Sequence, residues 1–251
     1  MSVNIKNLEI GAGKTKICVP VIGRTDEEIL SQAMELKYSV ADIIEWRVDF
    51  FDDVMDCDKV LKMTDKIVDV LGDKPVLFTF RCKKEGGEKC IDTVNYKKLL
   101  KTVIRHNKVG AVDVEAFMEE GLLEEISKAA ADYDVKIIAS NHDFDGTPEK
   151  DEIVRRLMAM KKMGAHICKI AVMPKNPRDV LTLLTATTEV KNKDRDMTII
   201  TMSMGQLGVI SRVSGKTFGS AMTFGARTKE QASAPGQLMM NELKNILDSI
   251  E

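Results

Sequence analysis

The segment His166-Ile-Cys-Lys-Ile-Ala-Val-Met173 places a lysine, Lys169, within an apolar run that ends at Pro174. A run this short and rich in β-branched residues is typical of a strand buried on both faces, as in a parallel sheet. Because side chains alternate across a strand, Ile167 and Ala171 share the face of Lys169 whichever way it points. Burial lowers the pKa of a lysine, and nucleophilic lysines that form Schiff bases with carbonyl substrates arise in this way. The alternative interpretation is a lysine at the strand end that reaches solvent or pairs with a carboxylate.

Short apolar segments of the same kind recur along the chain, each followed by a helical segment. The expected strands are 16–22, 42–49, 75–81, 111–115, 135–140, 166–172, 197–202 and 218–224. Eight such units, at a period of roughly 25–35 residues, imply the α/β class and a (β/α)8 TIM barrel. An open doubly wound sheet is the competing fold, but it usually has fewer strands at this length. The first strand-to-helix turn, Gly23-Arg-Thr-Asp26, also lacks a glycine-rich phosphate-binding fingerprint.

The segments between and around these strands complete the expected architecture. Helices are expected at 26–36, 58–71, 96–106, 119–131, 148–163, 176–190 and from 236 to the C-terminus, with Thr25 as the N-cap of the first. Residues 3–10 alternate apolar and polar side chains before a Gly-Ala-Gly turn, which predicts a strand forming one arm of a hairpin. By analogy, this N-terminal β-hairpin would close the bottom of the barrel. No linker rich in Pro, Gly or Ser divides the chain, so we expect one domain over residues 1–251.

The composition narrows the class of protein. Hydrophobic residues make up 44% and charged residues 30% of the chain, which argues against disorder. The net charge is −2 with the basic residues dispersed, so we expect neither a nucleic-acid nor a membrane partner. The N-terminal residues lack the apolar core of a signal peptide, and no apolar run approaches the ~20 residues that span a bilayer. The five cysteines are odd in number and never spaced as CxxC, which favours reduced thiols in a cytoplasmic protein.

Polar side chains, together with two methionines, gather at the predicted carboxyl ends of the strands, where barrels of this kind carry out their chemistry. They are Glu45, Arg47, Arg81, Asp113, Glu115, Asn141, His142, Asp143, Lys169, Met202, Met204, Arg212, Ser233 and Gln237. Each also has a structural interpretation: the charged residues could form ion pairs inside the barrel, and the methionines could pack a pocket wall. Together, polar residues at seven strand ends predict a site.

A lysine and a histidine on neighbouring strand ends can divide a carbonyl reaction between them. Lys169 would condense with a ketone to give an iminium, which acidifies the adjacent C–H bond. His142 would take that proton and return one to a departing hydroxyl, because an ordinary histidine pKa of about 6.5 suits both transfers. Glu85 or Asp143 could orient the imidazole. The planar forks of the two arginines at strand ends three and seven suit a substrate carboxylate and vicinal hydroxyls. No cluster has metal-ligand spacing and the imine is itself the electron sink, so we expect no metal and no organic cofactor.

Eight motifs, in order along the whole chain, resemble those of type I 3-dehydroquinate dehydratase. They are Glu45-Trp-Arg-Val-Asp49, Thr79-Phe-Arg81, Glu85-Gly-Gly-Glu88, Ser140-Asn-His-Asp-Phe144, Lys169-Ile-Ala-Val-Met-Pro174, Ser203-Met-Gly with Ser211-Arg212, Phe218-Gly-Ser-Ala-Met-Thr-Phe-Gly225 and Ser233-Ala-Pro-Gly-Gln237. The resemblance implies a (β/α)8 barrel, usually a homodimer, without a cofactor. It also implies the dehydration of 3-dehydroquinate to 3-dehydroshikimate, in the shikimate route to chorismate and the aromatic amino acids.

The resemblance assigns roles position by position. It makes Lys169 the Schiff-base lysine, His142 the general acid/base and Glu85 the carboxylate beside that histidine. The implied substrate-binding residues are Arg212, Ser233 and Gln237 for the substrate carboxylate, Glu45, Arg47 and Arg81 for the ring hydroxyls and the frame of their pocket, and Met202 and Met204 for the pocket wall. One departure is Pro20, which stands where many relatives carry a serine and removes one expected hydrogen bond to substrate.

Two rival functions stay open at this point. An aldolase acting on a phosphorylated sugar would also use a lysine imine, and it predicts a glycine-rich phosphate cradle after strands seven and eight. Gly205-Gln-Leu-Gly208 is the candidate cradle, although Arg212 and Gln237 suit a carboxylate better. The second rival is a barrel that binds a carboxylate ligand without catalysis.

Overall fold

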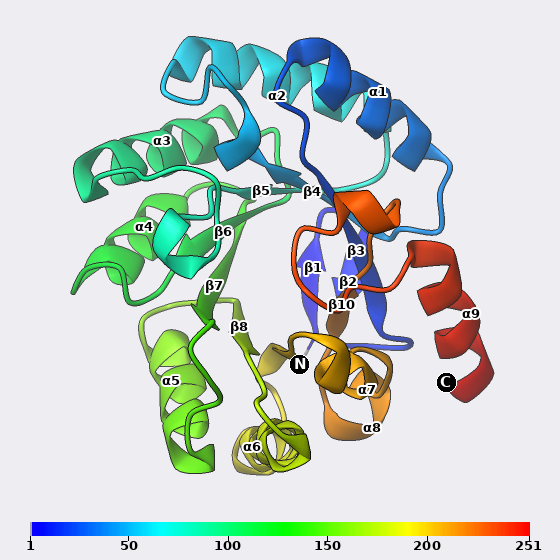
Figure 1. The fold of residues 1–251 in the computed structure, drawn as a ribbon. Coiled ribbons are helices and arrows are strands. Elements are labelled where there is room, and N and C mark those ends of the chain that lie inside the picture. Colours follow the sequence, from blue (N-terminus) through cyan, green and yellow to red (C-terminus); the bar gives the residue numbers. More distant parts are fainter. Residues whose placement is uncertain (1) are drawn as a thin grey trace.

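An eight-stranded parallel sheet curls into a barrel with helices outside it (Figure 1). The structure, a computed structural model, describes residues 2–251. The barrel strands are β3 (Lys16–Val21), β4 (Ile43–Arg47), β5 (Val76–Thr79), β6 (Ala111–Glu115), β7 (Lys136–Asp143), β8 (Ile167–Val172), β9 (Thr198–Ser203) and β10 (Met222–Phe224). Between β9 and β10, a parallel bridge joins Ile199 to Ser220, and Ala221 N donates to Ile199 O at 2.8 Å. The predicted (β/α)8 barrel is therefore confirmed, and the open sheet is excluded.

Helices connect successive strands along the outside of the barrel. They are α1 (Asp26–Lys37), α2 (Cys57–Leu71), α3 (Thr93–His106), α4 (Leu122–Ala130), α5 (Lys150–Lys162), α6 (Pro177–Lys193), α7 (Val209–Val213), α8 (Gly215–Phe218) and α9 (Met240–Ile250), with 3₁₀ turns η1 (Val48–Phe50), η2 (Lys83–Glu85), η3 (Gln206–Gly208) and η4 (Lys229–Gln231). The predicted cap of α1 is confirmed, since Thr25 Oγ1 accepts a hydrogen bond from Glu28 N. Within the described residues, no helix combines the length and the apolar character needed to cross a membrane.

Strand β8 shows how the sequence sorts side chains between two cores. Cys168, Ile170 and Val172 pack in the outer core between sheet and helices. Ile167 and Ala171 point into the barrel with Lys169 between them, as alternation predicts. All six residues of β8 are buried, and the strand pairs in parallel with β7 and β9. The expectation of a doubly buried parallel strand is thus confirmed.

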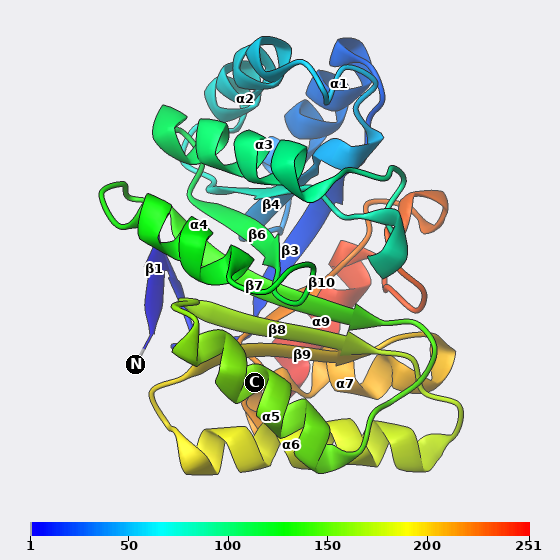
Figure 2. The same cartoon turned by 90° about the vertical axis from the view of Figure 1, so that its left-hand side faces the viewer.

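The N-terminal segment closes the bottom of the barrel, but not in the form expected for residues 3–10. Both arms of the hairpin lie within this range, as β1 (Val3–Ile5) and β2 (Leu8–Ile10). The chain reverses where Lys6 adopts a left-handed φ of 53°, a conformation that a lysine rarely takes. Ile5 and Ile10 are fully buried in the inner core. Figure 2 shows the hairpin at the end of the barrel opposite the strand arrowheads.

The last part of the chain also differs from expectation. The predicted strand 218–224 is too long, because α8 extends to Phe218 and Gly219 then takes a left-handed φ of 102°. The strand therefore begins only at Met222. The helix expected from residue 236 begins at Met240. The segment before it forms a loop at the carboxyl ends of the strands, where Ser233, Ala234 and Gln237 help to line a cavity.

Candidate active site

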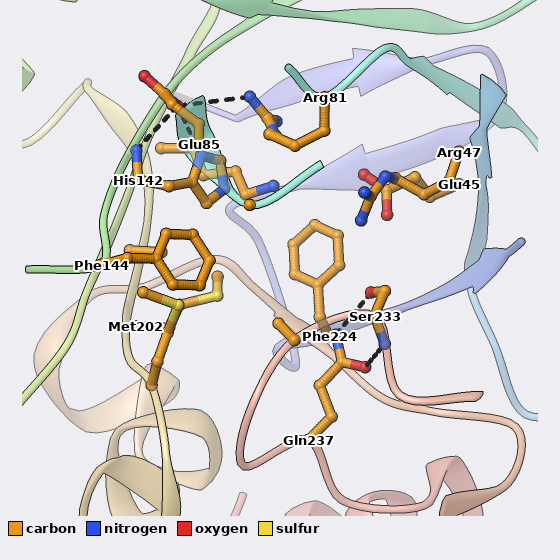
Figure 3. Close-up of a pocket in the computed structure, with 15 residues that line it drawn as sticks. Glu45, Arg47, Arg81, Glu85, His142, Phe144, Met202, Phe224, Ser233 and Gln237 are labelled. Carbon is orange, nitrogen blue, oxygen red and sulfur yellow. Dashed lines mark hydrogen bonds and ion pairs between the residues drawn. The ribbon is translucent and has the colours of Figure 1, made fainter. Parts of the chain in front are cut away.

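A cavity opens at the carboxyl ends of the strands (Figure 3). Its wall is formed by Glu45, Arg47, Arg81, Glu85, Gly86, His142, Phe144, Lys169, Ala171, Met202, Met204, Phe224, Ser233, Ala234 and Gln237. Of the eleven residues that were assigned a catalytic or substrate-binding role from the sequence, ten are in this wall, and Arg212 is the exception. Phe144 and Phe224 were quoted in the motifs but given no role from the sequence.

Lys169 lies inside the barrel and is only 4% exposed. Its Nζ is 3.6 Å from Asp113 Oδ2 and 4.3 Å from the centre of the Phe224 ring. The lysine is therefore shielded from bulk water while it faces the cavity. The interpretation in which Lys169 reaches solvent at a strand end is therefore wrong. The interpretation in which Lys169 pairs with a carboxylate is confirmed, because Asp113 lies beside it.

The ring of His142 is held by Glu85, on the η2 turn after β5. Glu85 Oε2 accepts from both the backbone nitrogen and ring Nδ1 of His142, each at 2.9 Å. Glu85 Oε1 accepts from Asn141 Nδ2 at 3.1 Å. Asp143, the other candidate for this role, instead forms an ion pair with Arg156 at 3.3 Å. Of the two carboxylates considered, Glu85 is therefore the one that orients the imidazole.

Burial and neighbouring cations set the charge of this pair. Burial, followed by the charges of Arg81, Lys169 and Arg47, holds the pKa of His142 well below its ordinary value. Burial raises the pKa of Glu85 to about 7, although Arg81 opposes the rise. The imidazole is thus neutral at neutral pH. With the Nδ1 proton assigned to the bond with Glu85, the lone pair on Nε2 is available as a base.

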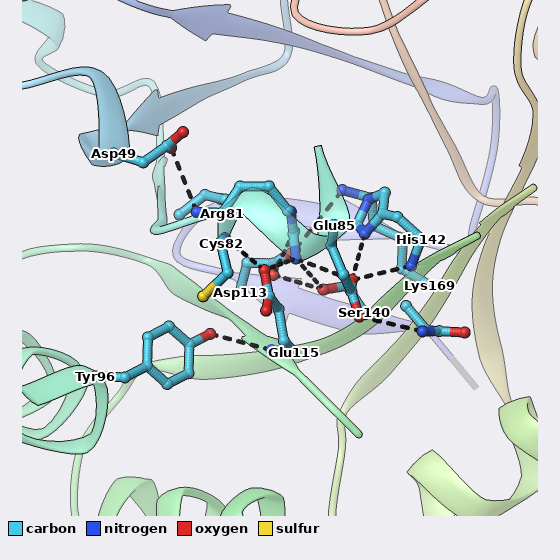
Figure 4. Close-up of polar contacts among 12 residues, drawn as sticks. Asp49, Arg81, Cys82, Glu85, Tyr96, Asp113, Glu115, Ser140, His142 and Lys169 are labelled. Carbon is cyan, nitrogen blue, oxygen red and sulfur yellow. Dashed lines mark hydrogen bonds and ion pairs between the residues drawn. The ribbon is translucent and has the colours of Figure 1, made fainter. Parts of the chain in front are cut away.

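Arg81 connects two carboxylates on β6, one carboxylate on the turn after β5 and a hydroxyl on β7 (Figure 4). Its Nη2 donates to Asp113 Oδ1 at 2.6 Å, and its Nη1 donates to Glu115 Oε1 at 3.0 Å and to Ser140 Oγ at 3.0 Å. Glu85 Oε2 is 3.5 Å from the same Nη1. Arg81 therefore forms ion pairs inside the barrel and fixes a buried network that reaches both Lys169 and His142.

Asp49 is a fully buried carboxylate that sequence reasoning left without a role. It accepts from Arg47 through both Nε and Nη2 at 2.8 Å, and from the backbone nitrogens of Arg81 at 3.3 Å and Glu88 at 3.0 Å. It thereby fastens the cavity arginine to the loop that carries Glu85. The only signal in the sequence was its place at the end of the first quoted motif.

Glu45 lies in the cavity wall but does not pair with the arginine two residues after it. Its Oε1 accepts instead from Thr79 Oγ1 at 2.9 Å, and the side chain is buried. A carboxylate held by one hydroxyl retains acceptor capacity for a substrate hydroxyl.

Arg212 lies behind the cavity wall and is 1% exposed. Its Nη2 donates to Pro235 O at 2.9 Å, and its Nη1 is 3.8 Å from Met202 Sδ. Its Nε has no hydrogen-bond partner among the described residues, and burial lowers the pKa of the guanidinium to about 10.

Ser233 and Gln237 lie in the wall and are bonded to each other, since Gln237 Nε2 donates to Ser233 Oγ at 3.1 Å.

The remaining histidines lie outside this wall. His106 Nε2 is 2.7 Å from Asp65 Oδ1, and His166 Nδ1 accepts from Ile137 N at 3.0 Å. In the part of the chain that the structure describes, no group of three or more His, Cys, Asp or Glu side chains is placed to hold a metal ion.

The fold is a (β/α)8 barrel, and its cavity lies at the carboxyl ends of the strands, where enzymes of this fold have their active sites. Comparison with known proteins identifies the family. The family model of type I 3-dehydroquinase matches residues 17–251. The chain therefore belongs to the type I 3-dehydroquinase family and is a hydro-lyase.

Curated relatives and solved structures agree with this family. A 3-dehydroquinate dehydratase of Listeria welshimeri is 51% identical over 246 residues, covering 98% of this chain and 96% of the relative. One of Clostridium botulinum is 49% identical over 245 residues, with the same coverage. The crystal structure of the type I enzyme from Clostridium difficile, with covalent modified comenic acid, has a TM-score of 0.95 at 47% identity, covering 100% of this chain and 97% of that one. The enzyme from Geobacillus kaustophilus also has a TM-score of 0.95, at 35% identity, covering 100% of this chain and 96% of that one.

Proposed function

We propose that this enzyme dehydrates 3-dehydroquinate to 3-dehydroshikimate through a Schiff base on Lys169, with His142 as general acid/base. One observation carries the proposal: a lysine shielded from water lines the same cavity as a neutral, carboxylate-oriented histidine. A buried amine and a base with a free Nε2 are the two groups that imine-based proton abstraction needs.

The proposed reaction has four balanced steps. The amine of Lys169 attacks the ketone of the substrate, and loss of the carbonyl oxygen as water leaves an iminium. His142 takes a proton from the carbon next to the iminium, giving an enamine. The enamine expels the hydroxyl on the following carbon, and His142 returns its proton to that oxygen, so that water departs. Water then hydrolyses the conjugated iminium, which restores the lysine and releases the enone product.

The substrate-binding roles follow the chemistry of each side chain. Arg212 is a buried cation without a carboxylate partner among the described side chains, an arrangement that favours binding of a substrate carboxylate. Because Arg212 lies behind the wall, its Nη2 would exchange the Pro235 carbonyl for that carboxylate. Ser233 and Gln237 would add hydrogen bonds from the same loop. Glu45, Arg47 and Arg81 would contact the ring hydroxyls or frame their pocket, with Met202 and Met204 as apolar wall.

A direct assay tests this function against its rivals. Addition of 3-dehydroquinate should produce the ultraviolet absorbance of a conjugated enone, and borohydride added with substrate should stop it. An aldolase would instead turn over a phosphorylated sugar, and a non-catalytic binder would give neither absorbance nor trapping. The covalent modification in the Clostridium difficile relative supports a covalent mechanism over simple binding.

We also propose that the enzyme acts in the cytoplasm as a homodimer, in the shikimate route to chorismate. The five unpaired cysteines support the compartment, because thiols stay reduced there. Sedimentation velocity tests the oligomeric state, and complementation of a strain that requires aromatic amino acids tests the pathway.

A further inference from the structure

We propose that Asp113 is a positioning residue that holds the reactive nitrogen of Lys169 as its anionic partner, first as ammonium and then as iminium. This inference rests on the Schiff base proposed above. The carboxylate is fully buried in the barrel, two strands away from the lysine. Lys169 is on β8 and Asp113 on β6, so both belong to the alternate strands whose side chains meet in one layer of a (β/α)8 barrel.

The two oxygens of Asp113 have different surroundings. Oδ1 accepts from Arg81 Nη2 and from Ser140 Oγ, each at 2.6 Å. Oδ2 accepts no hydrogen bond from the described residues, and it lies 3.6 Å from Lys169 Nζ. Arg81 and Ser140 therefore fix the carboxylate plane, so that the unoccupied oxygen faces the lysine. A buried acceptor is rarely left without a donor, and here the donor would be the N–H of the substrate iminium.

The charge of Asp113 is secured in the folded protein. Burial alone would raise the pKa of this carboxyl, but Arg81, Lys169 and the hydrogen bond from Ser140 hold it below its ordinary value. The carboxylate is thus ionised at neutral pH. An iminium carries the same positive charge as the ammonium it replaces, so one fixed anion can stabilise both.

Other groups near the lysine are less suited to this role. The charged or titratable side chains that share the cavity or the barrel interior with it are Glu45 and Arg47 on β4, Arg81 just after β5, Glu85 on η2, His142 on β7 and Cys18 on β3. Glu85 is bonded to His142 and Asn141. Burial holds Cys18 protonated by raising its pKa, and it holds His142 neutral. Glu45 accepts from Thr79 and forms no ion pair with Lys169 among the described contacts. The β9 and β10 neighbours, Met202 and Phe224, do not titrate.

The first experiment compares two carboxylates that share Arg81 as partner. Borohydride trapping of the 3-dehydroquinate adduct is followed against pH in the wild type, Asp113→Asn and Glu115→Gln. Asp113→Asn removes the anion that lies 3.6 Å from the reactive nitrogen, so the pH midpoint of trapping should fall in D113N. The fraction trapped at saturating substrate should fall as well. E115Q should keep the wild-type midpoint. An unchanged midpoint in D113N, or an equal shift in E115Q, would overturn the inference.

A second experiment needs no activity and holds even if D113N does not fold. The depressed pKa of Asp113 contributes stability that is present above the ordinary carboxyl pKa and is lost as pH falls through the folded value. Lys169→Met removes one of the cations that depress it, so K169M should unfold at a higher pH than wild type during acid titration. An identical acid midpoint in K169M would contradict the pairing. Wild-type protein that traps no substrate would instead refute the proposed Schiff base, while this stability test would remain valid.

Discussion

Glu85 Oε2 receives two hydrogen bonds from His142, from the backbone nitrogen and from ring Nδ1, each 2.9 Å long. One oxygen thus fixes both the position of the strand end and the rotation of the ring. Because Glu85 comes from the turn after β5 and His142 from β7, this contact depends on the assembled sheet. It directs Nε2 away from Glu85 and is the basis of the first prediction.

Glu85→Gln should remove a pH dependence near neutrality. The carboxyl has a pKa of about 7, and its ionised form is the better acceptor for the Nδ1 proton and increases the basicity of Nε2. In the wild type, kcat/KM should therefore rise as pH increases through about 7. In the variant, this rise of kcat/KM with pH should be absent, and kcat should be about 10–100-fold lower. Steady-state rates between pH 5.5 and 9 measure both effects. If kcat/KM of E85Q still rises at the same pH, the pH dependence belongs to another group.

His142→Ala should separate imine formation from proton transfer. Lys169 keeps its environment, so the imine still forms, but without the base the turnover should fall by about 10²–10⁴-fold. Borohydride should therefore trap adduct in a variant that makes almost no enone. His106→Ala, which removes a histidine outside the cavity, is the matched control and should be fully active. Near-normal turnover in H142A would show that its role is assigned wrongly.

Arg212→Lys should weaken substrate binding more than it slows chemistry. A lysine keeps the positive charge but loses the planar fork that binds a carboxylate through two hydrogen bonds. We expect KM to rise about 10–100-fold with a much smaller change in kcat, since such charge-assisted pairs contribute roughly 1.5–3 kcal/mol. Initial rates against 3-dehydroquinate concentration measure the two constants. Arg155→Lys, at an exposed helix position, is the control, and an unaltered KM in R212K would place the carboxylate elsewhere.

Gly87→Ala tests how tightly the loop that carries Glu85 is packed against the backbone of Arg81. A Cβ at this position would lie 1.8 Å from the backbone oxygen of Arg81, so the backbone itself must move. We expect a loss of about 2–3 kcal/mol in the free energy of unfolding, measured with urea, together with reduced activity. Gly146→Ala is the control, because its Cβ would meet only the end of the Lys175 side chain at 3.6 Å. Equal stability of the two variants would show that the loop tolerates displacement.

The barrel could be predicted because its signals are local. The apolar run at 166–172 coincides with β8, and alternation alone placed Ile167 and Ala171 beside Lys169. The errors fell where backbone conformation departs from residue preference. Lys6 takes a left-handed φ at the hairpin turn, and α8 occupies the start of the segment read as the last strand.

The sequence predicted which residues line the site, but not which of them contact one another. Ten predicted residues share one cavity because parallel strands bring their carboxyl ends to one face. Which carboxylate meets which cation depends on strand order, register and tilt, and spacing along the chain does not encode these. Asp49 therefore went without a role, and Asp113 was not linked to Lys169. The position of Arg212 behind the wall depends on the loop at Pro235, so it could not be predicted from the sequence either.

The most direct test is the site of covalent attachment. The enzyme is reduced with borohydride in the presence of 3-dehydroquinate, digested, and examined by mass spectrometry, with Lys169→Ala treated in parallel. We predict that the peptide containing Lys169 gains the mass of the reduced adduct, and that the variant gains none and makes no enone while keeping its circular dichroism spectrum. An adduct on another lysine, or enone formation without any trapped adduct, would contradict the account.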